Sequence, residues 1–417
     1  MSRRAVRPGP ALVVAAGATI VLAGVGIVSS RPDIVGMALP VVIWIAMVHG
    51  RANVDAATAV EVTSRPASVD AIETVIDVDS AADAVELTIV QSQRRTRTIV
   101  VPGRRGRVVA RSRILHSGPI TAVRIAARGI LAEGALLGPA TPVLEDVRHI
   151  EPDLIAIDAL PLPRSLTGLH GAHQGRRPGH GGDFRDIHPF APGDELRRVD
   201  WRATARMARR PGDLLVRRTQ TVSDASVVIA IDTAEDLGTV VASWGSGDGE
   251  RSGVTSLDRA RQAARSIASS AIGGGDRVAL HVLVHGGRSV RSGSGSRHLA
   301  RLEATIAAIS QADDDATFRR TPPVPPGSVV YVVSTFFQGA AADTALMWRG
   351  GGHRVVAVDI LPELDRSRLT PAQRIALRVV MAERENVLSD LRGAGIDVMT
   401  WSDAASGDLR VAARTRR

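Results

Sequence analysis

Hydrophobic residues follow three successive patterns along the chain, and the first is continuous. Residues 11–30 are almost wholly apolar, and a second apolar run covers 34–48 with Pro40 inside it. A helix of about 20 apolar residues crosses the roughly 30 Å of hydrocarbon in a bilayer. Because a charged connector separates the two runs, the chain has to turn back there. We therefore predict a hairpin of two transmembrane helices within residues 1–51.

Arginines at both ends of this hairpin set its expected orientation. Arg3, Arg4 and Arg7 precede the first run, and Arg51 follows the second. By the positive-inside rule both ends face the cytoplasm, so the sequence predicts a multi-pass protein of the cell membrane with cytoplasmic domains. A cleaved signal peptide and a single anchor with outside domains are the alternatives. The second apolar run argues against the signal peptide, which a polar mature region would follow.

The second pattern is an alternation of apolar and polar residues at period two over residues 52–150. Short alternating segments between Gly and Pro turns predict a small antiparallel β-sandwich. The expected strands are 74–79, 85–91, 97–101, 107–115 and 122–130. Residues 94–113 read as a β-hairpin whose outward positions are arginine.

The third pattern, over residues 221–417, alternates strands with helices. Residues 226–232 are continuously apolar, as buried parallel strands are. Repeated βα units predict a doubly wound α/β domain. The expected strands are 226–232, 277–284, 329–334, 353–359 and 397–401, and the expected helices are 256–272, 297–309, 343–348 and 371–392. With 151–220 as a linking segment, the chain is predicted to be a membrane-anchored α+β multidomain protein.

Composition removes several classes of function. The chain has no Cys, which excludes disulfides, thiolate metal sites and Cys nucleophiles, and its basic residues other than His are all Arg, which excludes a P-loop lysine. The net charge of +9 comes from Arg94–Arg113, which holds eight arginines and no acid. A charge confined to one segment argues against a nucleic-acid binder. These arginines either keep an edge strand soluble or contact anionic lipid of the cytoplasmic leaflet, and both interpretations stay open.

Residues 180–218, here named the signature segment, hold the densest group of specific residue types: HGGDFRDIHPFAPGDELRRVDWRATARMARRPGDLLVRR. Acids and arginines are equally numerous between 183 and 206, which predicts Arg–carboxylate pairing within the segment. Pro192-Gly193-Asp194 predicts a turn, with Asp194 capping a helix from 195 towards 207. The aromatic side chains of Phe184, Phe190 and Trp201 are expected to hold the segment on an apolar surface.

The stretch GHGGDFRDIHPFAPGDELRRVDWRATAR, followed by LLVRR, resembles the signature of the DUF58 family. Members of that family accompany MoxR-type AAA+ ATPases and transglutaminase-like membrane proteins. The resemblance therefore implies a MoxR-type partner and an adaptor role in assembly or envelope processes. The expected partner-binding residues are Asp183, Arg185, Pro192, Gly193, Asp194, Arg197, Asp200, Trp201 and Arg206.

The order of elements in 221–417, together with this signature, is similar to a von Willebrand factor A domain. Such domains bind Mg²⁺ through a D-x-S-x-S loop, a Thr and a further Asp. The resemblance implies Asp232, Asp236 and Thr255 as ligands here. The chain departs from the pattern, because Ala234 and Asp236 replace the two serines and residues 334–336 read Ser-Thr-Phe where an Asp is expected. Alternatively, Asp232 hydrogen-bonds its own loop or caps a helix.

These features favour a non-catalytic interaction protein with no established cofactor. The alternative is a hydrolase that uses the acids of residues 183–200 for acid–base chemistry. Each of those acids has an arginine within three residues, which favours its ionised form and makes it a poor proton donor. Adhesion to an outside ligand would need the opposite topology and an intact metal loop.

Overall fold

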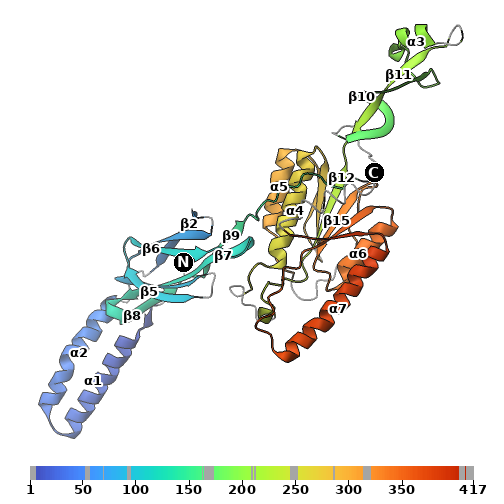
Figure 1. Ribbon diagram of the computed structural model, residues 1–417. Coiled ribbons are helices and arrows are strands. Elements are labelled where there is room, and N and C mark those ends of the chain that lie inside the picture. Colours follow the sequence, from blue (N-terminus) through green and yellow to red (C-terminus); the bar gives the residue numbers. More distant parts are fainter. Residues whose placement is uncertain are drawn as a thin grey trace. The chain divides into compact units, whose positions relative to one another are not determined.

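The computed structural model describes residues 6–51, 57–68, 70–91, 95–161, 163, 173–207, 210, 213–244, 252–284, 287–312, 321–402 and 409, without the side chains of 173–183, 185 and 219–223. The chain divides into two compact units. The first comprises Met1–Leu115 and Ile120–Arg148, and the second His116–Pro119 and His149–Arg417. Their elements are labelled in Figure 1.

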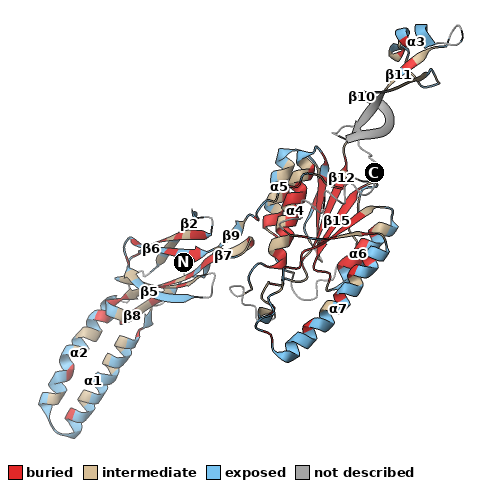
Figure 2. Ribbon diagram, viewed as in Figure 1, coloured by how far each residue is buried: buried red, intermediate tan, exposed pale blue. Residues whose placement is uncertain are grey.

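The first unit begins with two long apolar helices, α1 (Pro10–Val28) and α2 (Pro32–Arg51). Both are long and apolar enough to cross a membrane. Most of their side chains are exposed (Figure 2), among them Val14 at 70% and Ile20 at 72%, so these helices are not the core of a soluble domain. The prediction of two apolar N-terminal helices is confirmed, and their length and composition suit a membrane anchor.

The helical hairpin is joined to the following sheet by a close backbone contact. Gly9 lies between the short strand β1 (Arg7–Pro8) and α1, and its N–H donates to the Ala135 carbonyl over 2.8 Å. A Cβ at this position would lie 2.0 Å from the Gly134 oxygen, so only glycine fits. Nearby, Val48 and Trp44 of α2 belong to an apolar cluster with Leu136. The helices and the sheet therefore share packing at this end of the unit.

Two antiparallel sheets form the rest of the first unit. One contains β2 (Thr58–Ser68), β3 (Ala71–Ser80) and β6 (Gly106–Arg113). The other has the order β1–β8–β7–β4–β5 with β9 also on β7; its further bounds are β4 (Ala84–Gln91), β5 (Thr96–Pro102), β7 (Gly118–Leu131), β8 (Leu136–Ala140) and β9 (Leu144–Ile150), with the 3₁₀ turn η1 (Ala132–Gly134) between β7 and β8. Alternate residues of both sheets, such as Ile76, Leu87 and Ile125, meet in one core.

The predicted hairpin over 94–113 is wrong. Strand β5 pairs with β4, whereas β6 pairs with β3, so the connection between them crosses from one sheet to the other. The crossing is tight: a Cβ at Gly103 would lie 1.8 Å from the Ala82 oxygen, and Arg105 has a left-handed φ of 52°. Two consecutive alternating strands look the same in sequence whether they pair or face each other across a core.

The second unit contains a six-stranded sheet in the order β14–β13–β12–β15–β16–β17. Every neighbouring pair is parallel except that of β14 with β13. The strands are β12 (Ser226–Asp232), β13 (Arg277–Leu283), β14 (Ser289–Gly293), β15 (Val329–Ser334), β16 (Arg354–Asp359) and β17 (Asp397–Thr400). The antiparallel β14 was missed because its Ser, Arg and Gly residues carry little strand signal.

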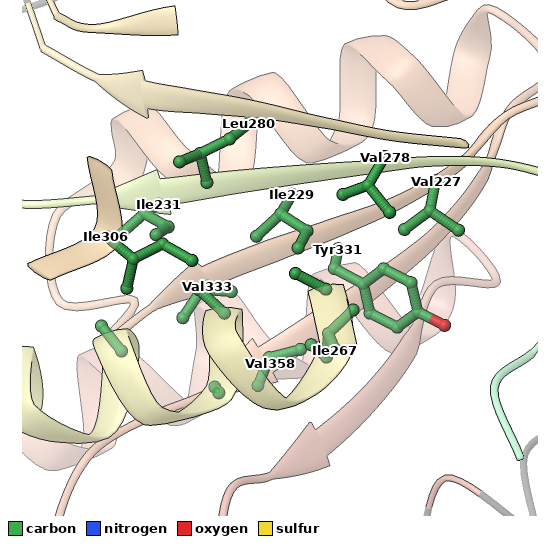
Figure 3. Close-up of a cluster of buried hydrophobic side chains, with 14 of the residues drawn as sticks. Val227, Ile229, Ile231, Ile267, Val278, Leu280, Ile306, Tyr331, Val333 and Val358 are labelled. Carbon is green, nitrogen blue, oxygen red and sulfur yellow. The ribbon is translucent and has the colours of Figure 1, made fainter. Parts of the chain in front are cut away.

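Helices cover both faces of this sheet. They are α4 (Ser256–Gly273), α5 (Ser296–Ala307), α6 (Gly339–Gly350) and α7 (Pro371–Gly393). Side chains of β12, such as Ile229, meet Ile267 of α4 and Ile306 of α5 in one core (Figure 3). The opposite face packs on α6 and α7 through residues such as Ala345 and Leu388. The sequence prediction of a mixed α/β architecture is confirmed.

Two parts of the expected linking segment 151–220 have definite structure. Residues 151–157 lie along α4, where the Ile155 N–H donates to Ser266 Oγ over 2.9 Å and Ser270 Oγ donates to the Ile157 carbonyl over 3.0 Å. The Gly-rich start of the signature segment belongs to a long strand, β10 (His173–Pro189), paired antiparallel with β11 (Leu215–Ser223). Glycine permits extended backbone as readily as a turn, so its presence alone does not predict a loop.

Candidate functional site

The Pro192-Gly193-Asp194 turn of the signature segment is present and closed by Asp194. The Asp194 N–H donates to the Ala191 carbonyl over 3.0 Å, and its carboxylate accepts the Ala191 N–H over 2.9 Å. Gly193 has a φ of 100°, which non-glycine residues rarely adopt. The Asp194 carboxylate also lies 3.4 Å from His188 Nε2. This acid therefore fixes the shape of the turn.

The predicted helix from 195 to 207 is instead two pieces, the 3₁₀ turn η2 (Leu196–Arg198) and the short helix α3 (Trp201–Met207). Asp200, and not Asp194, caps α3, since its carboxylate accepts the Ala203 N–H over 2.9 Å. The Asp200 N–H donates to the Leu215 carbonyl, and the Leu215 N–H donates to Thr204 Oγ1 over 3.0 Å. Two reciprocal bonds thus hold α3 against β11.

Among the described side chains of the signature segment, fewer acids pair with arginine than the sequence predicted. Glu195 Oε2 lies 2.6 Å from Arg197 Nε and 3.4 Å from Arg198 Nε. The Glu195 hydrogen bond raises the pKa of the Arg197 guanidinium. Asp194 and Asp200 accept backbone N–H groups instead, so the expected network of bidentate Arg–carboxylate pairs is wrong for these two acids. The side chains of Asp183 and Arg185 lie outside the described residues.

Aromatic and apolar side chains of the signature segment face solvent. Trp201 is 64% exposed, Phe184 51% and Phe190 38%. The expectation that they hold the segment on an apolar surface is therefore wrong. Leu196 and Met207 are as exposed as Trp201, and Arg206 lies beside Met207 on α3. The chain has few aromatic residues, but their small number carries no information about whether they are buried.

A second group of polar residues lies at the carboxyl ends of strands β12, β15 and β16. We name it the strand-end cluster; its members are Asp232, Glu235, Ser334, Thr335, Asp359 and Arg384. Ser334 Oγ donates to Asp232 over 2.7 Å, and the Ala234 N–H donates to the other Asp232 oxygen over 3.1 Å. Burial raises the pKa of Asp232 against the effect of these bonds. Burial likewise raises the pKa of Glu235, which accepts the Thr335 hydroxyl over 2.7 Å.

Arg384 of α7 neutralises this cluster and was missed by sequence reasoning. Its guanidinium forms an ion pair with Asp359, and its Nε donates to the Thr335 carbonyl over 2.6 Å. The same group lies over the Phe337 ring, 5.4 Å from the centroid. Arg384 is only 5% exposed. A signal existed, because it lies on the same helical stripe as the buried Leu377, Leu388 and Leu391.

The expected Mg²⁺ ligands do not fit a hard cation in this arrangement. Thr255 caps α4 in a capping box with Asp258, where its oxygen accepts the Asp258 N–H over 3.3 Å. Asp236 accepts the Leu257 N–H of the same helix over 3.2 Å. The two Asp232 oxygens accept from Ser334 and Ala234 as described above. In the described part of the chain, no group of three or more His, Asp or Glu residues that could hold a metal ion is found.

Asp258 makes a further set of contacts that the sequence did not indicate. His116 Nδ1 lies 2.7 Å from one of its oxygens, and the Ser117 N–H donates to the other over 2.8 Å. Ser252 Oγ lies 3.4 Å from His116 Nε2. Burial acts to raise the pKa of Asp258, but the His116 and backbone hydrogen bonds outweigh it and lower that pKa. A Ser–His–Asp series thus lies at the N-terminus of α4.

Residues 186–384 match the family model described as "Protein of unknown function DUF58". The match covers the larger part of the signature segment and most of the parallel sheet with its helices, and it ends at Arg384 of the strand-end cluster. No curated protein matches the chain significantly. The resemblance seen in the signature is thereby confirmed, and residues 186–384 of this chain belong to the DUF58 family.

Proposed function

We propose that this chain is a non-catalytic, membrane-anchored interaction protein that presents its signature segment to a protein partner. One observation carries the proposal: Leu196, Trp201 and Met207 expose 64–66% of their surface on the two short helical pieces of that segment. Exposed apolar residues beside arginines are the composition of interface hot spots, in which Trp and Arg are enriched. By family resemblance, the partner is a MoxR-type AAA+ ATPase.

The strand-end cluster supports the non-catalytic part of this proposal. Its carboxylates are occupied by Ser334, Thr335 and Arg384, which makes them a poor site for a substrate or a metal ion. The sheet with helices on both faces also agrees with the proposed von Willebrand A-like fold. In this proposal the domain serves as a rigid support for the signature segment.

Co-purification tests the partner. Full-length chain from detergent-solubilised membranes should recover an AAA+ ATPase, and Trp201→Ala should weaken that recovery at least thirtyfold, the size of a hot-spot loss of about 2 kcal/mol. Ile375→Ala is the matched control, because Ile375 is 56% exposed on α7. Equal recovery by all three chains would remove Trp201 from the interface.

The anchor and its orientation have a separate test. Because the chain lacks Cys, a single Ser30→Cys substitution in the turn between α1 and α2 gives one thiol. With both ends in the cytoplasm, a membrane-impermeant maleimide should label this thiol only from outside intact cells. Labelling only after the cells are opened would reverse the topology.

The Ser252–His116–Asp258 series favours a second candidate, a serine hydrolase. In that function His116 Nε2 would take the Ser252 hydroxyl proton, while Asp258 holds the Nδ1 proton. Against it, Asp258 is also committed to the helix cap through Thr255. A fluorophosphonate probe separates the candidates: the interaction protein should stay unlabelled, whereas labelling that disappears in Ser252→Ala would establish the hydrolase.

A further inference from the structure

Two pairs of exposed arginines in the first unit differ in their distance from the apolar helices. Arg104 and Arg105 lie in the β5–β6 crossing, and both side chains are exposed. Arg97 and Arg113 lie at the far ends of the same two strands and are also exposed. At about 3.3 Å per residue, seven or eight residues of strand separate the two sets by roughly 25 Å.

A chain of contacts connects the β5–β6 crossing to the end of α2. The Ser80 N–H donates to the Gly103 carbonyl over 2.8 Å, and the Gly103 N–H donates to the Asp83 carbonyl over 3.3 Å. Asp83 lies 3.8 Å from Arg51, the last residue of α2. The adjacent Ala82 shares a buried cluster with Val48 of that helix. Arg104 and Arg105 therefore lie at the end of the unit where the apolar helices emerge.

The surroundings of these two arginines fit a polar headgroup. They border a hollow of about 480 Å³, whose wall includes Thr58, Ser80 and Asp79. The guanidinium groups suit the phosphate of a headgroup, and the Asp79 carboxylate suits its glycerol hydroxyls. The Ser80 hydroxyl is already engaged, because it donates to the Ala57 carbonyl and accepts from Thr58. No ion pair of Arg104 or Arg105 is found in the described part of the chain, whereas Arg107, further along β6, pairs with Asp77 over 2.6 Å.

The backbone conformation of Arg105 also favours a role for its charge. Its φ of 52° is left-handed, which costs an arginine about 1 kcal/mol that a glycine would not incur. In this crossing, Gly103 and Gly106 already flank the two arginines. An arginine at the strained position thus adds charge at the expense of local stability.

We infer that Arg104 and Arg105 form a binding site for the headgroup of an anionic phospholipid at the membrane surface from which α1 and α2 emerge. This inference rests on the membrane anchor of the proposed function and does not require the protein partner. The site fixes the first unit against the leaflet. Arg97 and Arg113 lie too far along the strands to contribute, and Arg107 is paired with Asp77.

Titration of the detergent-purified full-length chain with dioctanoyl phosphatidylglycerol tests the inference. Arg104→Gln with Arg105→Gly should weaken binding at least tenfold, because each arginine near a membrane surface contributes about a factor of five. Arg97→Gln with Arg113→Gln removes the same charge and should leave binding unchanged. Glycine at 105 relieves the left-handed backbone, so the first variant is expected to fold.

Three results would overturn the lipid site. Dioctanoyl phosphatidylcholine could bind as well as phosphatidylglycerol, both double variants could lose affinity equally, or glycerol 3-phosphate alone could compete fully, which would indicate a free phosphate ligand. Carbonate extraction of native membranes separates this outcome from failure of the anchor. A chain that stays in the carbonate pellet but shows no lipid preference lacks only the site.

Discussion

The signature segment and the strand-end cluster are built from the same residue types with opposite exposure. In the strand-end cluster, Arg384 is 5% exposed and pairs with the buried Asp359. In the signature segment, the Arg197 side chain is 76% exposed and pairs with a partly exposed Glu195. Buried charges must be satisfied internally, whereas exposed charges stay free to meet a partner. The comparison assigns stability to the strand-end cluster and, in the proposed function, recognition to the signature segment.

The largest expected effect breaks the buried ion pair. Arg384→Ala leaves Asp359 uncompensated and should lower the free energy of unfolding by about 3–5 kcal/mol. Arg392→Ala on the same helix is the control, because Arg392 pairs with Glu385 at the surface and its loss should cost about 0–1 kcal/mol. Thermal unfolding of the full-length chain in detergent measures both. Similar losses in the two variants would contradict the division between the regions.

Two tryptophans give the same contrast for apolar side chains. Trp401 is fully buried, and its Nε1 donates to Gln262 over 3.0 Å, so Trp401→Ala should cost about 3–5 kcal/mol. Trp201→Ala, at an exposed position, should change stability by about 0.5 kcal/mol or less. Denaturant unfolding compares the variants. A large loss at Trp201 would mean that this side chain supports the fold and is not a docking residue.

The pH dependence of stability tests the strand-end cluster more finely. Burial raises the pKa of Asp232 above its ordinary value of 3.8, so the folded state binds this proton more tightly than the unfolded state. Asp232 therefore contributes a stability that grows as pH falls from neutral towards 3.8 and is absent above the folded pKa. Asp232→Asn should stabilise the chain at pH 7 and flatten this dependence. A steeper pH dependence in the variant would contradict the assignment.

A titration with Mg²⁺ tests whether the implied metal ligands bind a cation. The oxygen atoms of Asp232, Asp236 and Thr255 that would bind a metal ion already accept hydrogen bonds. Isothermal titration with millimolar Mg²⁺ should therefore give only the heat of dilution. Binding that disappears in Asp232→Asn would restore the metal site that the von Willebrand A resemblance implies.

The smallest effect concerns Tyr331 in the centre of the sheet. Its hydroxyl is buried and has no hydrogen-bond partner among the residues that the structure describes, and burial raises the pKa of that group. Tyr331→Phe removes an unsatisfied polar atom and should stabilise the chain by about 1 kcal/mol. Unfolding measurements at pH 7 check the sign. Destabilisation would show that the hydroxyl has a bound partner such as water.

The strands and helices of the parallel sheet were predictable because runs and caps of neighbouring residues specify them. The continuously apolar 226–232 and 329–334 are strands with those bounds, and the helix expected over 371–392 begins at Pro371 behind a Thr370 cap. Strand partners were not predictable in the same way. The β5–β6 crossing depends on a close approach of Gly103 to Ala82, which alternation at period two does not encode.

The candidate site was predictable only in part. The Pro192-Gly193-Asp194 turn follows from residue type, since Gly193 requires a left-handed backbone. The exposure of Trp201 and the burial of Arg384 do not, because both depend on what the rest of the chain places beside them. Local sequence specifies turns and caps, whereas burial of a single side chain is a property of the assembled fold.

Photo-crosslinking in living cells tests the central claim most directly. A photoreactive amino acid at position 201 of the full-length chain should capture an AAA+ ATPase, while the same amino acid at position 375, equally exposed on α7, should capture none. Capture at 375 but not at 201, or at neither position, would contradict the claim that the exposed signature segment is the docking surface of this protein.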